Sequence, residues 1–357
     1  MKLPPLKIGD LIARIPIIQG GMGIGVSLSN LASAVANEGG VGVISAAQIG
    51  FQEPDFFTNT LEANVRALRR EIRSAKNLSP NGIIGLNLMV AMTHYRELAE
   101  IAVEEGIDLI ISGAGLPTEL PGIVKGSKTK IAPIVSSAKA AAVISKYWDR
   151  KQQYIADIVV VEGPEAGGHL GFSMEQLLKN SEPKLLDIVK DVIEALKPYE
   201  DKYGKKIPVV AAGGIYSGED ITSHLLNGAS GVQIATRFVA THECDADLKY
   251  KMAYLNCKEE ELMIVKSPVG MPGRAIKNRF IDRINEHSIP VKKCFRCLKN
   301  CNPEDTPYCI TMALIEAVKG NVNDGLIFTG KNAYRLNKIV SVKELMNELI
   351  TEAELAY

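Results

Sequence analysis

Short apolar runs recur through the first 240 residues, and a helical pattern follows each of them. The runs are apolar throughout and do not alternate with polar residues, which is typical of strands buried on both faces of a parallel sheet. Eight strands are expected, at residues 16–19, 41–45, 83–88, 109–112, 131–136, 158–162, 208–212 and 231–234.

Helices are expected between these strands. Ser27 or Ser29 is suited to cap the first helix, which Gly39 ends. Further helices are expected at residues 93–105, 137–148 and 218–226. A strand followed by a helix, about eight times over, predicts a (β/α)₈ TIM barrel. A doubly wound open sheet is the structural alternative, which periodicity alone does not separate from the barrel.

The alternation stops near residue 240. Helices are expected at residues 242–257, 311–319 and 341–355, whereas residues 266–310 are rich in loop-forming residues. We therefore expect a barrel over residues 1–240 and a C-terminal lid and helical cap over residues 241–357. The loop at residues 270–274 is expected either to cover the site or grip an anionic substrate through Arg274, or to be a plain surface loop.

The composition narrows the classes of function. The chain has 41 Lys and Arg against 41 Asp and Glu. It therefore lacks the excess of positive charge that attracts nucleic acids or acidic membranes. No apolar run reaches the roughly 18 residues of a spanning helix. Asp10 and Arg14 interrupt the first apolar stretch, which does not resemble a signal peptide. We expect a cytoplasmic protein that binds small molecules, with a homodimer as an open alternative to a monomer.

The loops after the strands are where a barrel of this kind carries its active site. Residues 20–25 (GGMGIG) follow the first strand, and glycines there let the backbone approach a flat ligand closely. Residues 211–215 (AAGGI) and 233–237 (QIATR) follow the seventh and eighth strands, the usual place of a phosphate site in this fold. Ordinary tight turns are the alternative at each of these loops.

His169 lies among glycines in the loop after the sixth strand. A histidine at the working face of a barrel is typical of proton transfer or of polar substrate binding. An exposed loop histidine without such a role is the alternative. The other four histidines are expected at the surface.

Six motifs, in order along residues 16–240, resemble those of the FMN-dependent nitronate monooxygenase (2-nitropropane dioxygenase) family, which is close to the flavin-dependent enoyl-acyl-carrier-protein reductases II. They are QGGMG at 19–23, GLNLM at 85–89, SGAG at 112–115, EGPEAGGHLG at 162–171, AAGGI at 211–215 and GVQIATRF at 231–238.

The resemblance implies a role for each matching position. The loop at residues 21–23 would lie against the isoalloxazine ring of FMN, and residues 213–214 and 235–236 would hold its phosphate. The family usually has Gly where this chain has Ala235, whose backbone amide still serves. The implied flavin-binding residues are Gly21, Met22, Gly23, Asn87, Glu162, Gly168, Gly213, Gly214, Gln233, Ala235 and Thr236.

The resemblance also implies an FMN-dependent oxidoreductase with His169 as its catalytic acid or base. The leading form of the reaction is oxidation of a nitronate or nitroalkane by dioxygen. NAD(P)H-dependent reduction of an enoyl thioester is the alternative within the same group of flavoenzymes. A barrel that binds a phosphate-bearing ligand without redox chemistry is the alternative from another class.

The cap carries four cysteines in the pattern C-x₂-C-x₃-C-x₇-C, with basic residues between them. Thiolates beside cations have a lowered pKa and bind soft metals. The pattern therefore predicts a [4Fe–4S] cluster or a zinc ion, and the alternative is four reduced cysteines that pack as small apolar residues. The candidate ligands are Cys294, Cys297, Cys301 and Cys309.

Overall fold

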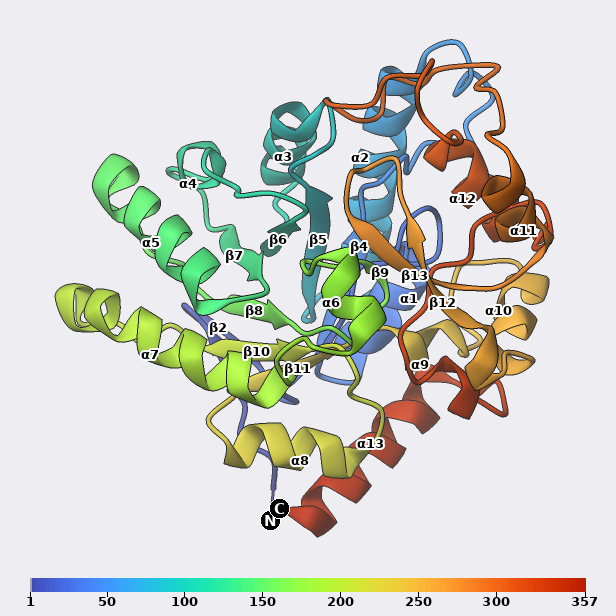
Figure 1. Ribbon diagram of the computed structural model, residues 1–357. Helices are drawn as coiled ribbons and strands as arrows, with labels where there is room; N and C mark the ends of the chain where they lie inside the picture. The colour runs from blue at the N-terminus through green and yellow to red at the C-terminus, as the bar shows by residue number, and fades with distance from the viewer. Residues whose placement is uncertain (1) are drawn as a thin grey trace.

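Within residues 2–357, the part of the chain that the computed structural model describes, eight parallel strands close into a barrel (Figure 1). The last strand hydrogen-bonds to the first, which confirms the (β/α)₈ barrel and excludes the open sheet. The strands in their order around the barrel are β3 (Ile17–Gln19), β4 (Val41–Ser45), β5 (Ile83–Met89), β6 (Leu109–Gly113), β7 (Lys130–Val135), β8 (Val159–Glu162), β10 (Val209–Ala212) and β11 (Gly231–Ile234).

Apolar side chains fill the barrel, which is a packed core and not a channel. Val43 and Val160 are fully buried there. At the amino ends of the strands, the hairpin of β1 (Leu6–Ile8) and β2 (Leu11–Ala13) buries Leu6 and Ile8 against the same core. The described residues therefore close the amino end of the barrel, and the active sites of such barrels lie at the carboxyl ends of the strands.

An outer ring of helices covers the barrel and buries its apolar side chains in the largest core cluster. The helices that follow the strands in the chain are α1 (Ser29–Asn37), α2 (Thr60–Leu78), α3 (Tyr95–Glu104), α4 (Leu120–Ile123), α5 (Ala138–Gln152), α6 (Met174–Lys179), α7 (Leu185–Tyr203), α8 (Gly218–Leu226) and α9 (Thr236–Val239). His224, expected at the surface, is buried in α8.

The start of α1 depends on residues far away in the sequence. The N-cap expected at Ser27 or Ser29 is wrong, because Leu28 occupies the cap position and its side chain forms no capping hydrogen bond. Asp245 instead accepts a hydrogen bond from the Leu28 N–H at 2.8 Å, and Glu71 of α2 accepts one from the Ser29 N–H at 3.1 Å. Carboxylates at a helix N-terminus are stabilising, so tertiary contacts replace the local cap.

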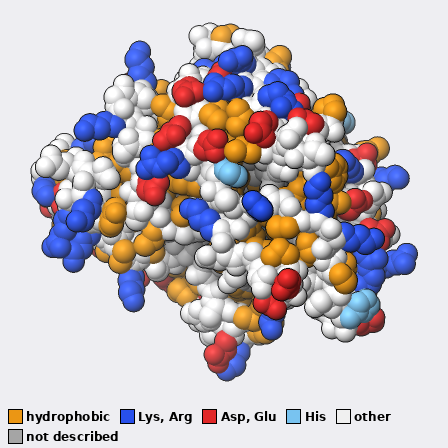
Figure 2. Space-filling model, turned by 90° about the horizontal axis from the view of Figure 1, so that it is seen from above, with side chains coloured by type: hydrophobic (Ala, Val, Ile, Leu, Met, Phe, Trp, Pro, Cys, Tyr) orange, Lys and Arg blue, Asp and Glu red, His pale blue; other side chains and the backbone are white. Residues whose placement is uncertain are grey.

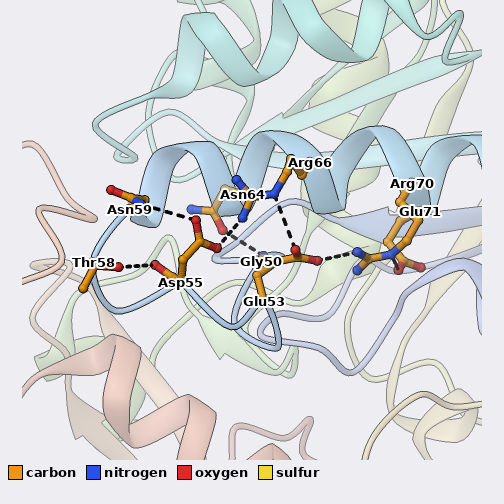
Figure 3. Close-up of polar contacts among 9 residues, drawn as sticks. All are labelled: Gly50, Glu53, Asp55, Thr58, Asn59, Asn64, Arg66, Arg70 and Glu71. Atoms are coloured by element: carbon orange, nitrogen blue, oxygen red, sulfur yellow. Dashed lines mark hydrogen bonds and ion pairs between the residues drawn. The ribbon is translucent and has the colours of Figure 1, made fainter.

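Ion pairs tie the loop after β4 to α2 (Figure 3). Arg66 and Arg70 of α2 both pair with Glu53 of the loop. Deeper in, Asn64 accepts a hydrogen bond from the Gly50 N–H at 2.8 Å. These contacts hold the loop that leads from a barrel strand to its helix.

The C-terminal part of the chain contains more regular structure than the sequence indicated. Residues 266–286, expected to be loop-rich, include the end of a hairpin and a helix. Strand β13 of this hairpin pairs with β9 (Gly168–His169), so His169 lies in a small antiparallel sheet. The elements are α10 (Leu248–Leu255), a 3₁₀ turn (Glu259–Glu261), β12 (Leu262–Lys266), β13 (Pro272–Ile276), α11 (Arg279–Glu286), α12 (Ile310–Val318), a second 3₁₀ turn (Ala333–Arg335) and α13 (Val342–Ala356).

The last helix, α13, joins the outer ring beside α8 and α1 (Figure 1). Its residues Leu345, Met346 and Leu349 are fully buried in the same core cluster as the other ring helices. The chain after residue 240 thus supplies both a cover for the barrel mouth and a helix that the barrel packs against.

Replacing Leu349 with Ala should lower the free energy of unfolding by about 2–5 kcal/mol, the usual effect of deleting a fully buried leucine side chain. Chemical denaturation measures the change. Leu355 lies on the same helix and is 84% exposed, so Leu355→Ala is the matched control and should stay within about 0.5 kcal/mol of the parent. Equal effects of the two substitutions would contradict the packing of α13 in the ring.

The surface carries charges of both signs. Seen from above, Lys and Arg side chains are interspersed with Asp and Glu and with hydrophobic side chains (Figure 2), as expected from the balanced composition. Within residues 2–357, no helix combines the length and the apolar character needed to cross a bilayer.

Candidate functional site

A cavity of about 440 Å³ lies at the carboxyl ends of the barrel strands. Every residue that the sequence indicated for flavin binding or catalysis lines it, although these residues come from five different strands and the loops that follow them. Those residues are Gly21, Met22, Gly23, Asn87, Glu162, Gly168, His169, Gly213, Gly214, Gln233, Ala235 and Thr236.

One wall of the cavity has no room for side chains. A Cβ atom on Gly21 would lie 2.3 Å from the Cβ of Asn87, which is far inside van der Waals contact. A Cβ on Gly23 would lie 2.8 Å from both the Ser45 Oγ and the Ala47 Cβ. The backbone of this loop therefore packs directly against these residues, and only glycine fits at the two positions.

A second part of the cavity wall is formed by the loops after β10 and β11. Gly213 and Gly214 have φ values of +97° and +83°, a left-handed conformation that favours glycine and turns backbone N–H groups toward a ligand. The cap braces this wall: Asn332 donates to the Gly214 carbonyl at 2.7 Å, and the Gly330 N–H donates to the Thr236 Oγ1 at 3.2 Å. The two loops are thus held in place from outside the barrel.

Gln233 carries an unsatisfied polar atom. Its Oε1 is buried and accepts no hydrogen bond from the residues that the structure describes. A buried acceptor without a partner is costly and rare in native proteins. Because Gln233 lines the cavity, a ligand with a hydrogen-bond donor would satisfy this atom.

His169 is held at the side of the cavity by two contacts from the cap. Its Nε2 lies 2.7 Å from the Ser267 Oγ. The Phe328 ring packs against the imidazole at a centroid distance of 4.9 Å and an angle of 65°. Burial lowers the pKa of His169 to about 4, so the imidazole is neutral near pH 7 and available as a base.

Glu162 ends strand β8 and lines the same cavity. Burial raises its pKa to about 8. A neutral carboxyl near pH 7 is a hydrogen-bond donor, so the cavity holds a neutral base and a neutral acid at the same time.

Arg274 does not form the positive tip of a loop. It lies in strand β13 and points toward the loop after β8, where its Nη2 donates to the Pro164 carbonyl at 2.7 Å. The side chain therefore anchors the chain just before His169 and does not grip a substrate. Met271, which directly precedes β13, lines the cavity.

Met271 lies in the loop for which a cover over the site was one expectation, but the sequence did not indicate the other residues that the cap adds to the cavity. They belong to α10, α12 and the segment before the second 3₁₀ turn, and no motif marks them because their place depends on how the cap folds back. These residues are Tyr250, Tyr254, Leu314, Phe328, Thr329 and Gly330.

The cysteine cluster receives no support as a metal site. Cys294 is exposed and the other three cysteines are partly buried. Burial raises the pKa of Cys297 and Cys309, opposite to the lowered pKa that was expected. Within residues 2–357, no three His, Cys, Asp or Glu side chains are arranged to hold a metal ion. The segment is anchored by the Phe295 ring, which stacks on Phe56 at 5.4 Å.

The fold and the cavity together define a barrel protein that binds its ligand at the carboxyl ends of the strands. A family model described as nitronate monooxygenase matches residues 6–352. The chain therefore belongs to the nitronate monooxygenase family and is an oxidoreductase by class.

Three relatives illustrate the similarity. A probable nitronate monooxygenase of Staphylococcus saprophyticus is 26% identical over 315 residues, 80% of this chain and 82% of the relative. The (3aS,4S,5R,7aS)-5-hydroxy-7a-methyl-1-oxo-octahydro-1H-indene-4-carboxyl-CoA dehydrogenase of Mycobacterium tuberculosis is 24% identical over 371 residues, 95% and 92% of the two chains. The solved structure of FabK from Thermotoga maritima has a TM-score of 0.72 and 26% identity, covering 96% and 93%.

Proposed function

We propose that this chain is an FMN-dependent oxidoreductase that oxidises a nitronate or nitroalkane with dioxygen as the electron acceptor. One observation supports the proposal most directly. A neutral, buried His169, the glycine loop after β3 and the two glycine-rich loops after β10 and β11 line the same cavity. Membership of the nitronate monooxygenase family supports the same reaction.

The residues present fit FMN. The wall at Gly21 admits no Cβ and suits a flat ring system, and the left-handed Gly213 and Gly214 suit a phosphate. The unsatisfied Oε1 of Gln233 suits a ring N–H donor. When bound, FMN supplies the two-electron redox chemistry that amino-acid side chains lack.

His169 is the base in this proposal. Its neutral imidazole accepts a proton from the carbon next to the nitro group, which is acidic because the nitronate that forms spreads its negative charge over the nitro oxygens. Glu162, protonated near pH 7, donates a hydrogen bond within the cavity. The aromatic residues Tyr254 and Phe328 of the cap limit the access of water to the reacting groups.

The pH dependence of the reaction follows from the burial of His169. The value of kcat/KM for a neutral nitroalkane should fall on the acid side with an apparent pKa near about 4, and not near the ordinary histidine value of 6.5. The base form is present above this pKa and is lost as the pH falls through it. Initial rates measured from pH 3.5 to 7.5 give the apparent pKa of this decrease. An apparent pKa of about 6.5 would contradict the effect of burial on His169.

The test of the proposed function begins with the purified protein. A yellow flavin spectrum, oxygen uptake and nitrite release in the presence of a nitroalkane are the expected results. A colourless protein that FMN does not bind would exclude the flavin and favour a barrel for another phosphate-bearing ligand.

Thioester chemistry is the second candidate. The relative that covers 95% of this chain is named a dehydrogenase of a CoA thioester, and reduction of an enoyl thioester by NAD(P)H is the corresponding reaction for this site. Anaerobic mixing with NADH or NADPH separates the two candidates, because only the reductase requires fast bleaching of the flavin spectrum. Bleaching without nitrite release would favour the second candidate.

A further inference from the structure

Ser267, in the C-terminal cap, contacts His169, which lies 98 residues earlier in the chain. It follows strand β12 directly, it is buried, and its Oγ lies 2.7 Å from the His169 Nε2. The pairing of β13 with β9 places Gly273 opposite His169, and Phe328 packs against the imidazole ring. The cap therefore fixes both the position of the ring and the partner of one ring nitrogen.

Hydrogen bonds hold the segment on either side of Ser267 in place. Tyr308 donates its phenolic proton to the Lys266 carbonyl at 3.2 Å. The Val269 N–H donates to the Ser267 Oγ at 3.3 Å.

The Ser267 Oγ occupies the Nε2 side of the imidazole, which leaves Nδ1 as the nitrogen that can face a substrate. For Nδ1 to act as the base, the proton of the neutral ring must lie on Nε2, which then donates to the Ser267 Oγ. We propose that Ser267 is a positioning residue that holds His169 in the tautomer protonated at Nε2 and leaves Nδ1 as the basic nitrogen. The proposal rests on the proposed function, which makes His169 the base. A hydroxyl orients the ring without adding a charge, so Ser267 determines which nitrogen reacts and does not raise its basicity.

The tautomer of His169 is measurable without turnover. Nitrogen-15 NMR at pH 7 of the flavin-containing protein, labelled at histidine and assigned with His169→Asn, should show a protonated Nε2 and an unprotonated Nδ1. The opposite tautomer in the wild-type protein overturns the proposal, and no substitution of Ser267 is needed to reach that result.

Substitutions of Ser267 provide a second test of the proposal. In Ser267→Ala, His169 should show a mixture of tautomers and kcat should fall roughly 10-fold, the effect of losing one hydrogen bond, while KM changes less than about twofold. Ser267→Thr keeps the hydroxyl and should restore both. Ser223→Ala, at an exposed serine of α8, is the control and should match the wild-type protein.

The outcomes separate the two proposals. A wild-type tautomer ratio in Ser267→Ala overturns the role of Ser267, whatever happens to the rate. If the wild-type protein oxidises no nitroalkane, the proposed function fails, and the NMR result still decides whether Ser267 selects the tautomer.

Discussion

Replacing His169 with Ala should lower kcat for nitroalkane oxidation by at least about 100-fold, because the variant has no group to accept the proton of the substrate. The fold should persist, since His169 lies at the cavity wall and not in the barrel core. Flavin content, measured from the visible spectrum, should be unchanged, which separates a loss of catalysis from a loss of cofactor. Steady-state oxygen uptake at several nitroalkane concentrations measures kcat and KM.

The control for this substitution is His94→Ala. His94 is exposed and its Nδ1 pairs with Glu97, three residues along the chain, so its loss should leave kcat within about twofold of the wild-type value. If His169→Ala keeps full activity, His169 is not the base. A nitronate supplied as the preformed anion should react in the variant better than the nitroalkane does, because its proton is already gone.

Replacing Gly21 with Ala should weaken FMN binding at least about 100-fold. The added Cβ would lie 2.3 Å from the Asn87 Cβ, so either the loop moves into the space of the ligand or Asn87 moves away from it. Overpacking of this kind costs roughly 1–3 kcal/mol or more, and the same movement removes contacts to the ring. Titration of the flavin-free protein with FMN, followed by fluorescence, measures the affinity.

Gly122→Ala is the matched control for the second substitution. Gly122 lies in α4, and the nearest atom to its added Cβ is 3.8 Å away in Gln152, so this change should leave both stability and FMN affinity unaltered. Tight FMN binding by Gly21→Ala would show that the glycine wall is not the flavin surface. Loss of binding in both variants would point to general instability instead.

The sequence predicted the barrel because most positions of its strands are buried and apolar and do not alternate with polar residues. It also predicted the strand-end residues, since the carboxyl ends of parallel strands meet at one end of a barrel and glycine or histidine there has no packing role. His169 and Gly214, distant in the chain, indeed line the same cavity. The roles of these residues remain proposals that the two substitutions above test.

Local patterns failed where distant segments supply the partners. No pattern near Leu28 reveals that Asp245 caps α1, and none near Ser267 reveals that it meets His169. The cysteine spacing is compatible with a metal site, but a ligand set requires convergent side chains, which spacing does not determine.

By itself, the sequence determined the alternation of buried parallel strands with helices and the residue types that the strand ends present, whereas the pairing of β11 with β3 decided that the sheet closes into a barrel. The alternation and the residue types depend on short-range periodicity and on the geometry of parallel strands, which are properties of local sequence. Only the tertiary structure decided how the chain after residue 240 folds back, which places α13 in the helix ring and Phe328 and Ser267 against His169. That arrangement depends on the apolar surface that distant segments bury together, and no local pattern records it.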